Sequence, residues 1–148
     1  MKKNLARCSG AAVLAACAVL LTPLAASGEQ ATFRVTLSGP PASGDPDGRG
    51  EATVTLDAET NQVEVRLTYS NIAEPTALFI RRGATGLEGN IVLPVVIESR
   101  QGNTIVARRT SAMPNAVARI LSAPEEHYLV VMNEEYPTNA LRGPLRAE

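Results

Sequence analysis

Strict alternation of apolar and polar residues constrains this chain more than any other feature. The alternating segments are residues 32–38, 52–57 and 63–69. In the first of them, Phe33, Val35 and Leu37 are separated by polar side chains. A period of two places successive side chains on opposite faces of a β-strand, so each segment predicts a strand with one buried face. The polar turn at 57–61 predicts that the second and third strands form a hairpin.

The second half of the chain continues the β-pattern with one interruption. Further strands are expected at residues 77–80, 91–97, 103–109, 127–132 and 140–146. Residues 114–122 change to helical spacing, with Pro114 in the first turn and Pro124 beyond the end. The run 91–97 is apolar on both faces, which predicts a strand covered on both sides. Pro94 within that run favours a sheet edge or a bulge, because proline has no N–H to donate.

These segments together predict one all-β domain. Seven or eight short antiparallel strands with turn residues between them are typical of a Greek-key β-sandwich or barrel, here with one short helix near 114–122. The domain is expected to span residues 32–146, after an N-terminal linker at 28–31. About 120 residues can bury a sizeable core without disulfide bonds.

Residues 1–27 have the composition of a secretory signal peptide. Lys2, Lys3 and Arg7 form a basic start, residues 11–21 form an apolar core, and small residues precede the Ser27–Gly28 bond. The apolar core is shorter than the ~20 residues that a membrane span needs. The expected location is therefore periplasmic or extracellular.

Cys17 leaves a second possibility open. Residues 14–17, Leu-Ala-Ala-Cys, have the pattern of a lipoprotein cleavage box, whose cysteine would be lipidated and would anchor the protein in a membrane. The apolar run continues past Cys17 to Leu21, however, whereas the tether after a lipidated cysteine is normally polar. Ordinary cleavage is the favoured prediction, and membrane association is expected only with lipidation at Cys17.

Removal of residues 1–27 changes the charge of the chain. The whole sequence has 14 basic and 15 acidic side chains; the signal segment holds three basic and no acidic ones, which leaves 11 against 15. A mildly acidic domain with scattered arginines is a poor binder of nucleic acid. Both cysteines, Cys8 and Cys17, lie in the signal segment, so disulfide bonds and cysteine catalysis are excluded for an unlipidated mature protein.

Five pieces of sequence, taken in order, resemble the chordin-type (CHRD) domain family over about residues 32–146. They are LSG at 37–39, GDPDGRGEATVTLD at 44–57, the segment Ala77 to Gly89 with its three glycines, the helix followed by EEHYLVV at 125–131, and NEEYPTNALRGPL at 133–145. The chain is similar to a divergent bacterial member of that family. The resemblance implies a β-sandwich module without enzymatic activity, and animal chordin, a member, binds growth factors of the bone-morphogenetic class.

The chain departs from the family pattern at three positions where the resemblance implies histidines. Leu78, Ile80 and Met132 occupy them. A His-x-His strand with a third histidine would form a plausible metal site, because residues two apart on a strand share a face. The apolar replacements predict instead a dry cluster of the three side chains, with no metal and no cofactor.

Other candidate groups give weaker signals. Asp45, Asp47 and Glu51 resemble the start of a calcium-binding loop, but the later ligands of that loop are missing. His127, the only histidine, has no nucleophile near it in sequence and is expected at the surface.

Arginines provide the remaining candidates. The pairs at 81–82 and 108–109 would form a cationic patch if their strands were neighbours, although pairing with the abundant acids is favoured. Arg142 is expected to pair with a carboxylate and to hold the last strand.

Two functional hypotheses follow from the sequence. The first is an exported, non-enzymatic binding or envelope-structural module that contacts an unknown protein partner in the cell envelope or outside the cell. The alternative is a metal-binding or redox protein with the architecture of copper–zinc superoxide dismutase.

Overall fold

The computed structural model describes residues 30–83 and 89–147. These residues contain nine β-strands, one α-helix and one short 3₁₀ helix. The strands are β1 (Gln30–Ser38), β2 (Arg49–Asp57), β3 (Gln62–Ser70), β4 (Pro75–Arg82), β5 (Asn90–Gln101), β6 (Thr104–Arg109), β7 (His127–Asn133), β8 (Leu141–Pro144) and β9 (Arg146–Ala147). The helices are α1 (Pro114–Ser122) and η1 (Pro124–Glu126). The signal segment and Cys17 lie outside the described residues. Among those described, no helix is long and apolar enough to cross a membrane.

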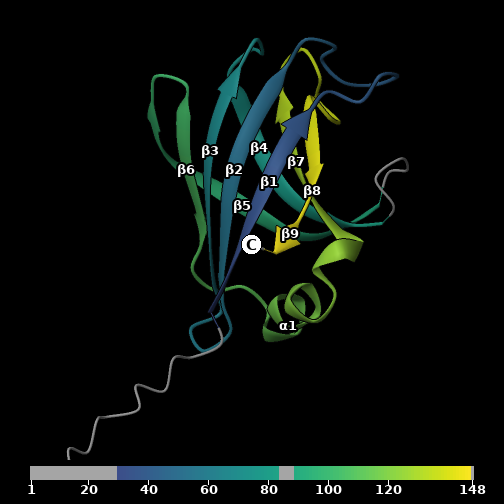
Figure 1. Ribbon diagram of the computed structural model, residues 1–148. Coiled ribbons are helices and arrows are strands. Elements are labelled where there is room, and N and C mark those ends of the chain that lie inside the picture. The colour runs from purple at the N-terminus through teal and green to yellow at the C-terminus, as the bar shows by residue number, and fades with distance from the viewer. Residues whose placement is uncertain (1–29, 84–88, 148) are drawn as a thin grey trace, which may run out of the picture.

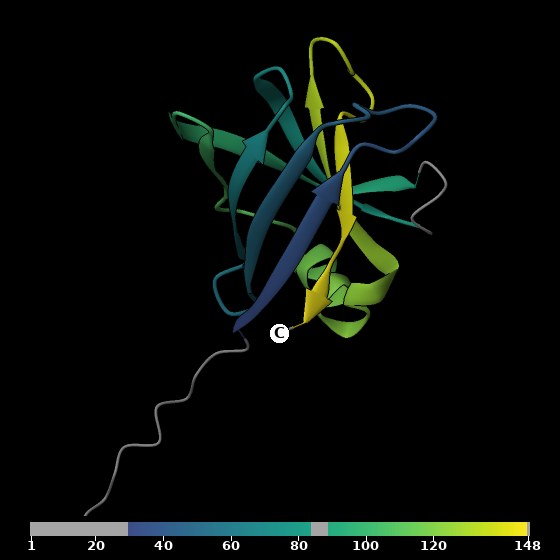
Figure 2. The same cartoon turned by 45° about the horizontal axis from the view of Figure 1, so that its top comes forward.

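Eight of the strands close into an antiparallel barrel, and β9 adds a ninth (Figures 1 and 2). The order around the barrel is β2-β3-β6-β5-β4-β7-β8-β1, and pairing of β1 with β2 completes the ring. Strands β4 to β7 form a Greek key, because β4, β5 and β6 are consecutive neighbours and β7 returns to lie beside β4. The all-β Greek-key prediction is confirmed, in its barrel form.

The alternating pattern of the sequence fills the barrel. Phe33, Val35 and Leu37 of β1 point inward and are at most 3% exposed, while Arg34 and Thr36 between them face outward. Strands β2 and β3 repeat the arrangement. Burial of each large aliphatic side chain contributes about 1.5–3 kcal/mol, which makes this interior the main source of stability.

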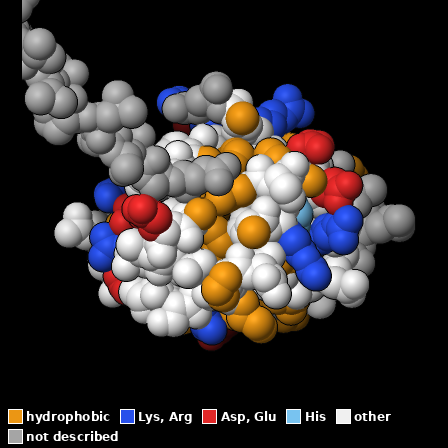
Figure 3. All heavy atoms as spheres, turned by 90° about the horizontal axis from the view of Figure 1, so that it is seen from below, with side chains coloured by type: hydrophobic (Ala, Val, Ile, Leu, Met, Phe, Trp, Pro, Cys, Tyr) orange, Lys and Arg blue, Asp and Glu red, His pale blue; other side chains and the backbone are white. Residues whose placement is uncertain are grey.

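Helix α1 lies at the lower end of the barrel (Figure 1). Its bounds agree with the sequence prediction, with proline in the first turn. Val117 and Ile120 are fully buried and belong to the same hydrophobic core as the barrel strands. Viewed from below, hydrophobic side chains gather across the middle of this end and charged side chains lie around its rim (Figure 3).

Strand β5 differs from the sequence prediction. Ile91 and Val96 are 52% and 58% exposed, so the expectation that both faces of this strand are covered is wrong. The barrel covers only the inner face, and no layer of the described residues packs on the outer one. Pro94 lies in a strand with neighbours on both sides, not at an edge, and pairs with Phe79 close to a shift in the β4–β5 register.

Glycines fix the base of the loop that follows β4. Gly83 has a φ of 149°, a conformation that side-chain-bearing residues rarely adopt. A Cβ on Gly89 would lie 1.8 Å from the carbonyl oxygen of Arg82, and the Gly89 N–H donates a 2.7 Å hydrogen bond to the Tyr128 hydroxyl. The predicted glycine-rich loop is thus fixed at its two ends; Gly86, its third glycine, lies outside the described residues.

Candidate functional site

The three family positions Leu78, Ile80 and Met132 do not converge. Leu78 and Ile80 are fully buried in the barrel interior. Met132 is half-buried and pairs with Ala77, one residue before Leu78, so its side chain lies on the outer face. The predicted cluster of three is therefore wrong for Met132. Leu78 instead pairs with Val131, and this register decides which side of the sheet each residue faces.

The calcium candidates are also separated. Asp45 is buried in the loop after β1, where its N–H donates to the Ala140 carbonyl at 3.1 Å. Asp47 is exposed, and Glu51 lies on the outer face of β2 opposite Thr36. Within residues 30–83 and 89–147, no three His, Cys, Asp or Glu side chains form a group that could hold a metal ion.

His127 is buried, and the prediction of a surface histidine is wrong. The residue is 1% exposed, and its Nδ1 lies 2.8 Å from the Ala123 carbonyl oxygen. Because a carbonyl only accepts, Nδ1 carries the proton, and Nε2 has no partner in the described part of the chain. Alternation correctly separated His127 from Tyr128, but the barrel interior lies on the histidine side of β7. A histidine so enclosed cannot meet a substrate from solvent.

The two predicted arginine pairs do not form a patch. Strand β5 lies between β4 and β6, so the pairs at 81–82 and 108–109 are not on neighbouring strands. Arg82 forms a 2.6 Å ion pair with Glu126. As favoured from the sequence, paired acids neutralise Arg82 and Arg108.

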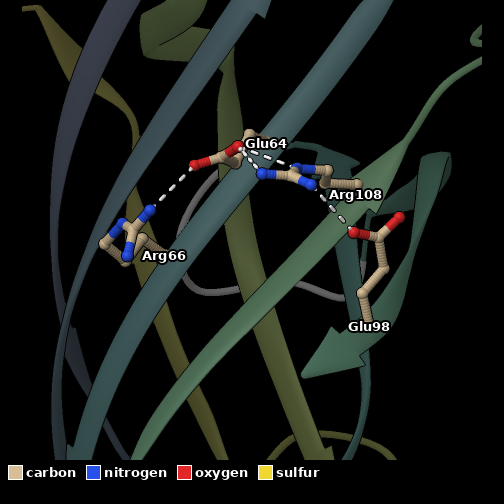
Figure 4. Close-up of polar contacts among 4 residues, drawn as sticks. All are labelled: Glu64, Arg66, Glu98 and Arg108. Carbon is tan, nitrogen blue, oxygen red and sulfur yellow. Dashed lines mark hydrogen bonds and ion pairs between the residues drawn. The ribbon is translucent and has the colours of Figure 1, made fainter. Parts of the chain in front are cut away.

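Arg108 belongs to a network of four charged side chains, the ion-paired face (Glu64, Arg66, Glu98 and Arg108; Figure 4). Glu64 accepts from Arg108 at 2.8 Å and from Arg66 at 3.3 Å, and Glu98 contacts Arg108 at 3.2 Å. The hydrogen bond from Arg108 is the main reason that the pKa of Glu64 is lowered. The same bond raises the pKa of Arg108. Each of these four charged side chains therefore forms an ion pair within the protein.

A second group of arginines lies at the seam where the two ends of the chain meet. On the outer face of β1, Arg34, Thr36 and Ser38 follow one another at every second position. Arg146 pairs with Arg34, and Arg142 pairs with Ser38. The C-terminal strands therefore carry a second row of outward-facing residues beside the row on β1.

Gly143 allows this close approach of β8 to β1. A Cβ at Gly143 would lie 2.1 Å from the Thr36 carbonyl oxygen, far inside van der Waals contact. Any side chain here would push the two strands apart. The glycine thus sets the spacing of Arg142 and Pro144, which flank it, against the row on β1.

The surface over the seam is hollowed. One hollow of about 520 Å³ is lined by Arg34, Thr36, Pro144, Arg146 and Ala147. A second, of about 320 Å³, shares Thr36, Pro144 and Arg146 and extends to Arg142 and Pro40. Because they share three residues, they form one groove, named here the arginine groove and defined by Arg34, Thr36, Arg142, Pro144 and Arg146.

The arginine groove differs from the ion-paired face because none of the described residues that line it is acidic. Neither Arg142 nor Arg146 forms an ion pair with any described residue, so the predicted carboxylate partner of Arg142 is not found. The alternation of Arg142, Pro144 and Arg146 in the sequence predicts that they share a face. Their position beside β1 could not be inferred, because it depends on a pairing between the two ends of the chain.

The sequence model of the CHRD domain family matches residues 25–145, almost the whole described barrel. The chain belongs to the CHRD domain family. Neither the curated proteins nor the solved structures gave a match. CHRD domains are a non-catalytic family, so membership points to a binding module.

Proposed function

We propose that this CHRD domain is an exported, non-enzymatic module that binds a protein partner in the cell envelope or outside the cell. The family membership supports a binding role, and the composition of residues 1–27 supports export. The enclosed position of His127 adds support. Histidine is the side chain most suited to acid–base chemistry, and the one histidine of the sequence has no access to a substrate.

The arginine groove is the observation that carries this proposal. Arginine is enriched in protein interfaces, because its planar guanidinium offers several donors that recognise carboxylates. Other arginines are held by acids of the chain itself: Arg66, Arg82, Arg100 and Arg108 each form an ion pair of 3.3 Å or less. Arg142 and Arg146 form no ion pair with another described residue, and both line a hollowed surface.

Cross-linking in exporting cells tests the binding role. The full chain with a C-terminal affinity tag would be expressed, cross-linked in intact cells and recovered with its partners. The double variant Arg142→Glu/Arg146→Glu should lose a partner that the wild type captures, and Arg66→Glu, a charge reversal on β3, should retain it. Identical recovery from all three chains, or no protein above background, would sink the proposal.

Export and lipidation are tested by an intact mass. Cleavage after Ser27 gives an unmodified chain that begins at Gly28, whereas lipidation gives a chain that begins at acylated Cys17. Fractionation of the same cells then separates a free periplasmic or secreted protein from a membrane-anchored one. A chain that retains residues 1–27 in the cytoplasm would refute export.

A metal-dependent or redox role is the less supported alternative. Two of the three positions where the family resemblance implies histidines are Leu78 and Ile80 in the core, and neither side chain can hold copper or zinc. Elemental analysis of the purified protein decides between the two functions. Stoichiometric copper or zinc would favour the metal-dependent role over the binding role.

A further inference from the structure

The geometry points to a specific ligand for the arginine groove: an extended acidic segment of a partner protein, with carboxylates four residues apart that meet Arg142 and Arg146. This inference rests on the proposed binding function and adds the chemistry of the partner.

Charge selects an anion. The described residues that line the groove contain no acid, and Arg142 and Arg146 have no ion-pair partner among the described residues. Among the described residues, Glu51 pairs with Thr36 on the β2 side and limits the groove there. Guanidinium groups bind carboxylates through two parallel hydrogen bonds, and the Thr36 and Ser38 hydroxyls supply further donors beside them.

Spacing selects an extended polypeptide. Arg142 and Arg146 are four residues apart in extended backbone, so their Cα atoms are separated by about 13 Å. Acidic side chains at positions i and i+4 of an extended segment have the same separation and point to the same face. A segment laid along the seam would thus place one carboxylate at each arginine, with Pro144 between them.

The backbone of the seam excludes strand addition. Strand β1 pairs with β2 along its whole length, and its other edge pairs with β8 at Ser38 and with β9 at Phe33 and Arg34, so neither edge is open to an added strand. Pro144 has no N–H, and Pro40 and Pro41 in the wall add none. Recognition therefore occurs through side chains on the outer face of the barrel.

A long polyanion fits less well than a short acidic segment. Residues 28–148 carry 11 basic and 15 acidic side chains in all, so the surface beyond the groove repels an extended run of phosphates or sulfates. A peptide with two carboxylates places its negative charge only where the arginines lie.

Fluorescence anisotropy with labelled heptapeptides tests the inference. Peptide TETVTET carries glutamates four residues apart, and TEETVTT has the same composition with adjacent glutamates. The purified protein should bind the first at least about fivefold more tightly, because only it reaches both arginines. Arg142→Ala and Arg146→Ala should each weaken binding about three- to tenfold, and Arg66→Ala should leave it within about twofold.

Circular dichroism and thermal unfolding establish that each variant is folded. Arg146 is exposed, so Arg146→Ala remains informative even if the half-buried Arg142 proves important for folding. Equal binding of the two peptides, or wild-type binding by Arg146→Ala, would overturn the inference. Heparin or anionic vesicles that bind more tightly than TETVTET, and depend on the same arginines, would replace the peptide with a polyanion. If cross-linked partners depend on Arg142 and Arg146 while neither peptide binds, the binding function stands and this ligand is wrong.

Discussion

The ion-paired face and the arginine groove are both arginine-bearing surfaces on the outside of one barrel, yet their charges are used differently. In the first, the β3–β6 register places Glu64 directly opposite Arg108, and Arg66 and Glu98 complete the network. In the second, Ser38 lies opposite Arg142, Arg34 lies opposite Arg146, and Thr36 and Pro144 lie between these two pairs. The comparison shows that cross-strand neighbours, not the arginines themselves, decide whether a guanidinium is committed to structure or available to a partner.

Gly143→Ala should have the largest effect, because it forces apart β1 and β8, the two strands on which the groove is built. The new Cβ would meet the Thr36 carbonyl, and β8 would have to move away from β1. We expect a loss of about 2–3 kcal/mol in the free energy of unfolding, measured by urea denaturation. Gly102→Ala is the control: its φ is positive, at 58°, but no atom lies within 4 Å of the new Cβ, so only the backbone strain of about 1 kcal/mol is expected. Equal losses would show that β8 is not held closely against β1.

Ser38→Glu should convert the groove into a second ion-paired face. The new carboxylate would lie opposite Arg142 on β8 and opposite Arg49 on β2. Binding of TETVTET should fall about tenfold, while stability stays the same or rises by up to about 0.5 kcal/mol from the added cross-strand pair. Gln101→Glu on β5 gives the same change in net charge at a distance and should leave peptide binding unchanged. A comparable loss in both variants would mean that net charge, not local pairing, governs binding.

The pH dependence of stability should distinguish the two surfaces. The pKa of Glu64 lies below its ordinary value of 4.5 because Arg108 donates to the carboxylate. The unfolded chain therefore binds a proton more readily than the folded one in this range, and the Glu64 contribution, present above about pH 4.5, is lost as the pH falls through the folded pKa. Arg108→Ala should flatten the fall of the urea midpoint between about pH 5 and pH 3. Arg142→Ala, which removes no carboxylate contact between described residues, should keep the wild-type slope; a flattened slope there would contradict the distinction.

Glu64→Gln should give the smallest change in binding. The substitution weakens the hold on Arg66 and Arg108, and leaves two partly released arginines on β3 and β6. These arginines lie on different strands and do not reproduce the spacing of Arg142 and Arg146. The affinity for TETVTET should therefore change by less than about twofold in anisotropy titrations. A clear gain would show that any released arginine suffices.

The sequence predicted those features that depend on local pattern. Alternation identified the strands and the all-β class, and the change of period with Pro114 identified α1 to the residue. Parity within β7 correctly placed His127 and Tyr128 on opposite sides. Parity alone could not say which side faces the barrel interior, because side chains on both faces of β7 are largely apolar and buried.

The features that escaped prediction depend on register between distant strands. Met132 shares a strand with Val131, but only the pairing of Leu78 with Val131 places it outside the core. The arginine groove needs the pairing of Ser38 with Arg142, which no local pattern encodes. The exposure of the outer face of β5 also escapes prediction, because an apolar sequence cannot distinguish a covered strand from an exposed one, as Val96 illustrates.

Closure of the barrel also has a consequence for how the chain folds. Strand β1 lies near the start of the described chain and β8 near its end, so the ring cannot close until the whole domain is available. Such non-local pairing slows folding, and before it forms, β1 and β7 each present an open edge that can join another chain. A chain of this design should reach its native state only after the last strand is released, and any delay in the docking of β8 should appear first as aggregation during refolding at high protein concentration.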